Sequence, residues 1–153
     1  MIDRPSRNRL AEALRQYVSG VLTNDDLDDV AVDWRDRGAV AVKGRAWGLY
    51  DDNYPHRATG RHYLGKPARH EIGRWILFLH SDLEYTWPDF DFMQIVNWPI
   101  NVLTFGWWER RKGKRFCEFT AAGDFDVWPF ASHADHERAL EQPRLLANRA
   151  APR

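Results

Sequence analysis

The sequence predicts a mainly α-helical fold, a single-domain helical bundle. Its 153 residues suit one domain, because domains cluster near about 100–150 residues. Several stretches repeat apolar residues at the three- and four-residue intervals of a helix that buries one face. Prolines and glycines separate these stretches, where helices begin or end. We therefore expect one helical domain over residues 1–142 and a mobile tail over residues 143–153.

The first helix is expected over residues 5–18. Pro5 suits the first helical turn, where a backbone N–H has no partner within the helix. Leu10, Leu14 and Tyr17 then recur at the spacing of one helical face. The Ser-Gly pair that follows is typical of a helix end.

An acidic stretch at residues 24–29 predicts a short second helix. Thr23 or Asn24 supplies a side-chain cap, and carboxylates are favoured near the positive end of a helix. A calcium-binding loop would require alternating ligands around a central glycine and a later glutamate, a pattern that this stretch lacks. We therefore assign these carboxylates to helix capping.

Residues 38–50 fit two kinds of structure. Their alternating valines are compatible with a strand, whereas Val40, Lys43 and Trp47 share the spacing of a helix. Three glycines weaken such a helix. We expect a helix here.

The most regular helical pattern runs from Lys66-Pro67 to about His80, after a connection rich in proline and glycine. Proline again suits the first turn. The apolar residues of this stretch lie at i, i+3, i+4 and i+7, on one face: Ile72, Trp75, Ile76 and Leu79.

The last third of the domain is expected to mix turns, a hairpin and a helix. Trp87 precedes Pro88, and the residue before a proline is pushed away from helical dihedrals. Aromatic residues flank an Ala-Ala-Gly-Asp turn, which indicates one small β-hairpin near residues 116–128. Ser132 begins a capping-box pattern with Asp in place of Glu, and it opens a final helix to about Gln142.

A tryptophan-rich block without charges occupies residues 92–108. As a helix it would span about 25 Å, which is short of the roughly 30 Å hydrocarbon core of a membrane. It also contains Pro99 and a stripe of polar residues at helical spacing: Gln94, Asn97, Asn101 and Thr104. An apolar stripe lies on the opposite side. The block is therefore expected to be an amphipathic element that lies between two environments.

A basic run follows the block directly, with Arg110, Arg111, Lys112, Lys114 and Arg115. Cations suit the C-terminal end of a helix and keep a turn solvated. They would also contact the anionic headgroups of a membrane surface. Basic residues beside aromatic ones can also bind nucleic acid, but the formal net charge of the chain is zero. Nucleic acid is thus an unlikely partner.

No catalytic pattern rises above its structural alternative. His133 and His136 have a spacing that zinc sites use, with His80 or Asp82 as a possible third ligand. Asp51 and Asp52 lie close in sequence to His56 and His62, a combination compatible with acid–base chemistry. The single cysteine, Cys117, lies in the expected hairpin, where packing is its usual role. No cofactor-binding motif and no complete metal-site motif is present.

Three segments resemble parts of small bacterial proteins to which no activity is attached: AWGLYDD, GRWILFLHSDLEYTWP and GDFDVWPF. The resemblance covers about half of the chain. It implies a single, mostly helical domain and carries over no catalytic residue.

We therefore expect a non-enzymatic module that binds another protein in the bacterial cytoplasm, as immunity and accessory proteins do. The alternatives are a peripheral membrane protein that uses residues 92–115 and a metal-dependent hydrolase. Trp, Tyr and Arg concentrate binding energy at interfaces, and the N-terminal residues lack the apolar core of a signal peptide. The residues expected to form the binding surface are Asp82, Glu84, Tyr85, Trp87, Gln94, Asn97, Asn101, Trp107, Trp108, Arg110 and Arg111.

Overall fold

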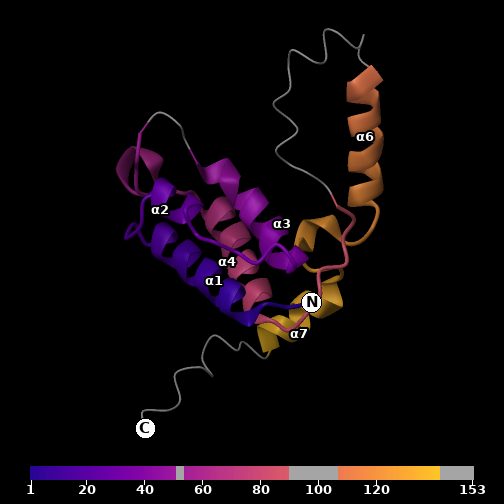
Figure 1. The fold of residues 1–153 in the computed structure, drawn as a ribbon, viewed down its shortest axis with the longest axis horizontal. Helices are drawn as coiled ribbons and strands as arrows, with labels where there is room; N and C mark the ends of the chain where they lie inside the picture. Colours follow the sequence, from indigo (N-terminus) through magenta and orange to yellow (C-terminus); the bar gives the residue numbers. More distant parts are fainter. Residues whose placement is uncertain (51–53, 90–106, 142–153) are drawn as a thin grey trace.

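The computed structural model describes residues 1–50, 54–89 and 107–141. Within these residues the fold is mainly α-helical, as the sequence predicts, with six α-helices and no strand (Figure 1). The helices are α1 (Arg4–Val18), α2 (Asn24–Asp28), α3 (Arg37–Ala46), α4 (Lys66–His80), α6 (Trp107–Thr120) and α7 (His133–Glu141). Three short 3₁₀ helices lie between them: Trp47–Leu49, Gly60–His62 and Phe125–Val127.

The core lies between α1 and α4, which run side by side, with α3 beside them and α2 at one end (Figure 1). Leu10 and Leu14 of α1 are fully buried, as is Leu79 of α4. Ile72 and Phe78 of α4 complete this layer. The helical spacing of the apolar residues therefore produces the packed face that the sequence predicts.

The helix starts follow from local hydrogen bonds. Thr23 and Asp26 form a reciprocal capping box on α2, in which the Asp26 N–H donates to Thr23 Oγ1 at 3.2 Å. Ser132 and Asp135 form the matching contact on α7, where the Asp135 N–H donates to Ser132 Oγ at 3.2 Å. Both confirm the predicted caps, because each satisfies a backbone N–H that has no partner within its helix.

The prediction of a small β-hairpin near residues 116–128 is wrong. Helix α6 continues to Thr120, and a 3₁₀ helix at Phe125–Val127 follows after a turn. Phe116 and Phe119 are three residues apart, which places them on one side of a helix, whereas in a strand they would point to opposite faces. The segment before them is rich in Arg and Lys, which favour helices. Cys117 is consequently exposed on a helix.

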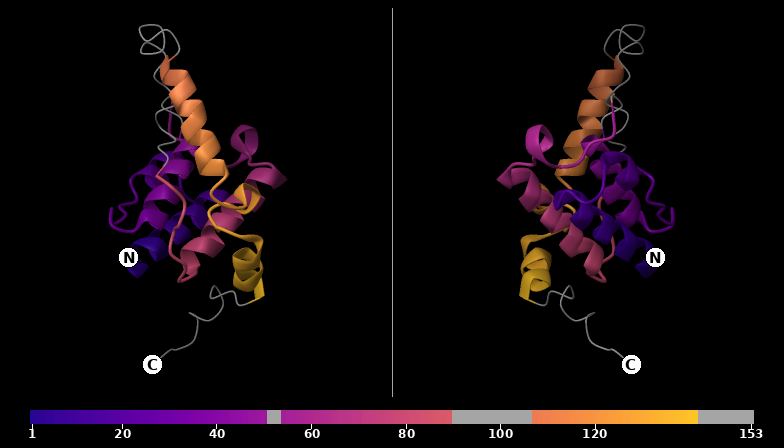
Figure 2. Two further views of the ribbon diagram at one scale, coloured as in Figure 1. Left: turned by 90° about the vertical axis from the view of Figure 1, so that its right-hand side faces the viewer. Right: turned by 90° about the vertical axis from the view of Figure 1, so that its left-hand side faces the viewer.

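Helix α6 projects from the bundle, and its C-terminal end is the part that meets the other described elements (Figures 1 and 2). Phe119 near that end is buried, with 1% of its surface exposed. Most of the tryptophan-rich block, residues 92–106, lies outside the described residues, and so does the expected tail at residues 143–153. The amphipathic character of that block stays a prediction.

Candidate functional site

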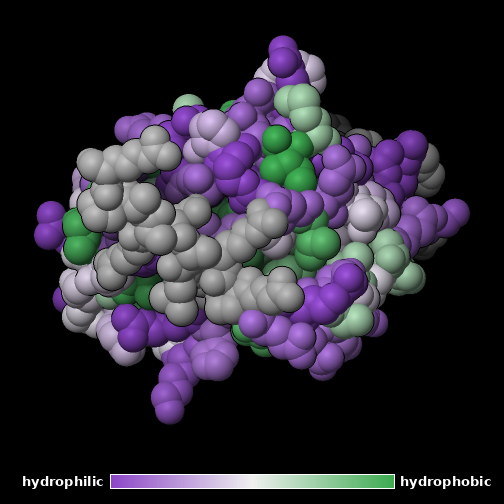
Figure 3. Space-filling view, turned by 90° about the horizontal axis from the view of Figure 1, so that it is seen from below, coloured by the Kyte–Doolittle hydropathy of each residue, from purple (hydrophilic) through white to green (hydrophobic). Residues whose placement is uncertain are grey.

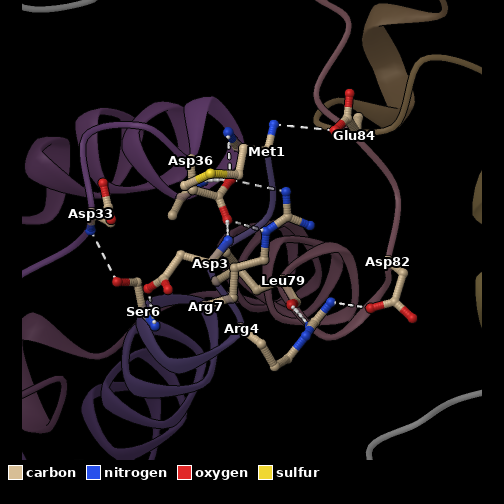
Figure 4. A network of polar contacts seen from close by, with 12 residues as sticks. Met1, Asp3, Arg4, Ser6, Arg7, Asp33, Asp36, Leu79, Asp82 and Glu84 are labelled. Atoms are coloured by element: carbon tan, nitrogen blue, oxygen red, sulfur yellow. Dashed lines mark hydrogen bonds and ion pairs between the residues drawn. The ribbon is translucent and has the colours of Figure 1, made fainter.

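Among the described residues, the most deeply buried ion pair joins the N-terminal helix to α3 (Figure 4). Arg7 of α1 donates two hydrogen bonds to Asp36, from Nε to Oδ2 at 2.7 Å and from Nη2 to Oδ1 at 2.9 Å. Both side chains are 1% exposed. Asp36 also caps α3, since its Oδ1 accepts from the N–H of Gly38 at 3.0 Å. Burial by itself would raise the pKa of Asp36, but hydrogen bonds from Arg7 and the backbone hold it below its ordinary value.

The same guanidinium satisfies backbone oxygens beyond the C-terminus of α4. Arg7 Nη1 donates to the carbonyl of Leu83 at 2.9 Å and to that of Ser81 at 3.2 Å. Arg4 donates to the carbonyl of Leu79 at 2.7 Å. These carbonyls lack partners within the helix. The polar network is therefore structural, because it holds the end of α4 against α1.

Asp82 and Glu84, two residues of the expected binding surface, pair with the N-terminal segment (Figure 4). Asp82 forms an ion pair with Arg4. The carboxylate of Glu84 lies 3.1 Å from the amino group of Met1. Both pairs are solvent-exposed, so each contributes little to stability by itself. They fix the path of the chain after α4.

Tyr85 and Trp87, also expected at the surface, are buried at 8% and 1% exposure. The indole N–H of Trp128 donates to the Tyr85 hydroxyl at 3.2 Å, and the indole N–H of Trp87 donates to the carbonyl of Pro129 at 3.2 Å. Burial raises the pKa of Tyr85 to about 12, although the hydrogen bond from Trp128 lowers it. Their rings belong to the core and do not face a partner, which corrects the expectation for these two residues.

Four of the other residues of the expected surface belong to α6. Gln94, Asn97 and Asn101 lie outside the described residues. Trp107, Trp108 and Arg110 belong to the first turn of α6. Arg111, one residue later, is exposed.

The histidine pairs have neighbours that explain them structurally. His133 Nε2 lies 3.0 Å from Asp126 Oδ2, whereas the ring of His136 packs against Phe130 at 5.1 Å between centroids. The rings of His56 and His62 stack at 4.0 Å. Among the described residues, no group of three or more His, Cys, Asp or Glu side chains is placed to hold a metal ion. Asp51 and Asp52 lie outside that part of the chain.

A small hollow of about 150 Å³ opens beside Asp82, between the end of α4 and α7. His80 and Arg138 line it together with Asp135. Burial lowers the pKa of His80, and the charges of Arg15 and Arg4 lower it further. Asp82 is paired with Arg4 and Asp135 with Arg138, so the carboxylates of this hollow are already neutralised.

A partly exposed group of aromatic rings lies where α6 meets the domain, and we call it the aromatic corner: Phe116, Phe119, Phe125 and Trp87. Phe119 and Trp87 form its buried base, with their rings 5.0 Å apart. Phe116 and Phe125 lie above them, edge to face at 6.0 Å. Phe116 remains 41% exposed and Phe125 38% exposed. Sequence reasoning missed this surface, because it placed both phenylalanines in a hairpin.

Beside Phe125 lies a cavity of about 250 Å³, lined by Arg45, Glu71, Arg74, Phe125, Asp126 and Trp128. Its carboxylates have partners: Glu71 lies 3.4 Å from Arg45, and Asp126 lies 3.0 Å from His133. The aromatic corner thus adjoins a polar hollow of mixed charge. Elsewhere, the face of the domain shown in Figure 3 is mostly hydrophilic, with separate hydrophobic groups.

Comparisons with known proteins found no matching family model, no similar curated protein and no similar solved structure. Within the described residues, no helix has the length and apolar character needed to cross a membrane.

Proposed function

We propose that the protein is a non-enzymatic module that binds another protein through the aromatic corner. The observation that carries this proposal is the exposure of α6. Of its described side chains at residues 111–120, only Phe119 is buried. A helix of this length is marginal unless it packs a face against something. Against the other described elements α6 buries only Phe119, so its exposed side suits a contact with a partner.

The chemistry of the corner suits a protein surface. Phe125 packs edge-on against Trp87 at 6.1 Å and against Phe119 at 5.9 Å. This base holds the exposed rings in place before binding, which lowers the entropy that a complex would lose. Buried aromatic anchors beside Arg are typical of the side chains that dominate binding energy, and Arg115 of α6 is exposed next to Phe116.

Carboxylates around the corner favour a protein over an anionic membrane. Glu118 lies between the two phenylalanines of α6 and is 3.9 Å from Lys114. Asp124 and Asp126 flank Phe125 in the chain, and both are exposed. A negatively charged headgroup layer would repel these groups, whereas a protein partner can offer both signs of charge.

The test is capture of a partner from cells that express the protein naturally. The wild type, a Phe116→Ser/Phe125→Ser variant and a Val40→Ser control would be immobilised in parallel. Val40 on α3 is 41% exposed, like Phe116, but lies outside the corner. We expect one stoichiometric protein with the wild type and with the control, and its loss with the double variant. Capture of no stoichiometric protein, or equal capture by all three, would overturn the proposal.

Binding to a membrane surface is the second candidate, because α6 exposes Arg111, Lys114 and Arg115. Each basic residue near an anionic surface contributes about 1 kcal/mol. This candidate requires sedimentation with anionic but not neutral vesicles, weakened by salt. An Arg111→Gln/Lys114→Gln/Arg115→Gln variant should then remain in the supernatant. Equal sedimentation of wild type and variant would exclude α6 as the membrane contact.

A further inference from the structure

A second surface lies between α4 and α7, as an open groove of about 470 Å³. One side is formed by Arg69, His70, Gly73 and Arg74 of α4, and the other by His136 and Leu140 of α7. The lining residues of α4 form two adjacent pairs, Arg69-His70 and Gly73-Arg74, that are four positions apart, and those of α7 are also four positions apart. Each helix therefore presents one side to the groove. Its volume falls in the range of about 300–1,000 Å³ that binding sites occupy.

Every ionisable side chain that lines this groove is an arginine or a histidine. Arg74 Nε donates to the carbonyl of Trp128 at 2.8 Å. Arg69 donates to the Tyr63 hydroxyl and to the carbonyl of Val18, both at 3.1 Å. These neutral acceptors orient the two guanidinium groups without cancelling their charge. In the described part of the chain, neither arginine forms an ion pair with a carboxylate.

The lowered pKa of His136 is consistent with positive charge in the groove. Burial lowers the pKa of His136, and the charges of Arg74 and His133 lower it further. Glu137 and Asp126 act in the opposite direction and do not outweigh them. Among the charges that act on the pKa of His136, the cations therefore act more strongly than the carboxylates.

Gly73 lines the groove without a side chain. It lies within α4, where glycine costs about 1 kcal/mol relative to alanine. A Cβ atom built there would meet nothing within 4 Å, so packing within the domain does not require a glycine. Gly44 and Gly113 are equally unobstructed, and Gly73 therefore supports the groove rather than defining it.

The groove also has an apolar part. Leu77 forms part of its lining and is 7% exposed, whereas Leu140 of α7 is 56% exposed. A ligand that covered Leu140 would remove that apolar surface from water, which is favourable. The ligand that complements the whole groove is therefore anionic and carries an apolar group.

We propose that the groove between α4 and α7 binds an acidic segment of a partner protein, with carboxylates at Arg69 and Arg74 and an apolar side chain over Leu140. The kind of partner rests on the function proposed above. Arg74 also lines the cavity beside Phe125, so the groove adjoins the cavity that lies next to the aromatic corner. One extended segment can contact both surfaces, with the charged groups setting its orientation.

The test is a selection of short random peptides on the full-length wild-type protein. Selected sequences should be rich in Asp and Glu that alternate with Leu, Ile or aromatic residues. Gly73→Leu should block them sterically without disturbing the fold, and His70→Glu should repel them. Both variants should weaken binding about tenfold or more. Arg35→Glu also introduces a carboxylate, outside the groove, and should bind as the wild type does although it changes the net charge by more than His70→Glu.

The proposal would be overturned if the selected peptides were not enriched in acidic residues, or if Gly73→Leu bound them as tightly as the wild type does. It would also be overturned if inorganic phosphate or single-stranded DNA, added at the same total charge as the peptides, displaced them. The function proposed above fails separately. If a captured partner depends on Phe116 and Phe125 but not on Gly73 and His70, only the groove is excluded. If acidic peptides bind the groove but no partner depends on the corner, only the corner is excluded.

Discussion

Arg7 and Asp36 form a bidentate ion pair at 2.7 and 2.9 Å, and each side chain is only 1% exposed. The pair connects α1 to the first turn of α3, and Arg7 extends the connection to the carbonyls beyond α4. A buried ion pair adds little net stability over a well-packed apolar pair, but removal of one partner leaves an unpaired buried charge. The arrangement of the bundle therefore depends on both residues together.

Asp36→Ala is expected to lower the free energy of unfolding by about 3–5 kcal/mol, because Arg7 would remain buried without a counter-charge. Urea denaturation followed by circular dichroism measures this. Glu12→Ala is the matched control. Glu12 lies 3.3 Å from Arg15, and both side chains are 52% exposed, so its removal should cost less than about 1 kcal/mol. Similar losses for both variants would contradict the role of the buried pair.

Stability should fall in acid. The pKa of Asp36 in the folded protein lies below its ordinary value of 3.8. Its contribution is therefore fully present above pH 3.8 and is lost as the pH falls through the folded-state value. The pKa values of Asp3 and Asp26 are also lowered, chiefly by hydrogen bonds with Ser6 and Thr23.

Urea denaturation at a series of pH values from about 5 to about 2 tests this dependence. Asp36→Asn should show a shallower decline than the wild type, because one of the linked carboxyl groups is gone. A flat profile for the wild type would contradict the expected linkage.

Gly38 and Gly73 should respond to alanine in opposite directions. A Cβ at Gly38 would lie 2.8 Å from Arg7 Nη2 and 2.9 Å from Phe78 Cε1. Gly38→Ala is therefore expected to destabilise the protein by about 1–3 kcal/mol through overpacking. Gly73→Ala, with nothing within 4 Å, should stabilise it by about 0.5–1 kcal/mol. Thermal denaturation measures the change in stability of each variant. Changes of the same sign in the two variants would contradict the close packing around Gly38.

Replacement of Arg74 should raise the pKa of His136. The charge of Arg74 lowers that pKa in the wild type, after burial itself. Arg74→Gln removes the charge and keeps a side chain of similar length. NMR titration of the His136 imidazole measures this change in pKa. Arg45→Gln is the control, because it removes a positive charge from the neighbouring cavity and should leave the pKa of His136 unchanged. A pKa that stays the same or falls would contradict the positive field in the groove.

Elements with a clear period or a cap were predictable from the sequence. The spacing of Ile72, Trp75 and Leu79 predicts α4, and the capping patterns at Thr23 and Ser132 predict where α2 and α7 begin. Each depends only on residues within one turn or one helix face. Predictions that depend on such local patterns therefore agree with the folded domain.

Features that depend on contacts between distant residues were not predictable. Arg7 carries a charge, and its burial follows only from Asp36, which lies 29 positions away in the sequence. Trp87 and Tyr85 were expected at the surface because Trp and Tyr concentrate binding energy at interfaces. Their hydrogen-bonding partners near Pro129 are more than 40 residues away. The aromatic residues on both sides of the Ala-Ala-Gly-Asp turn indicated a hairpin, whereas the three-residue spacing of Phe116 and Phe119 fits a helix, which explains the error in α6.

The central claim is that the aromatic corner binds a protein, and the most direct test is the affinity of the captured partner for purified variants. Isothermal titration should give a dissociation constant at least about 30-fold weaker for Phe116→Ser/Phe125→Ser than for the wild type, as expected when anchor side chains worth about 2 kcal/mol are lost. Val40→Ser should bind as the wild type does, and all three proteins should show the same helical content. Equal dissociation constants for the double variant and the wild type would contradict the claim.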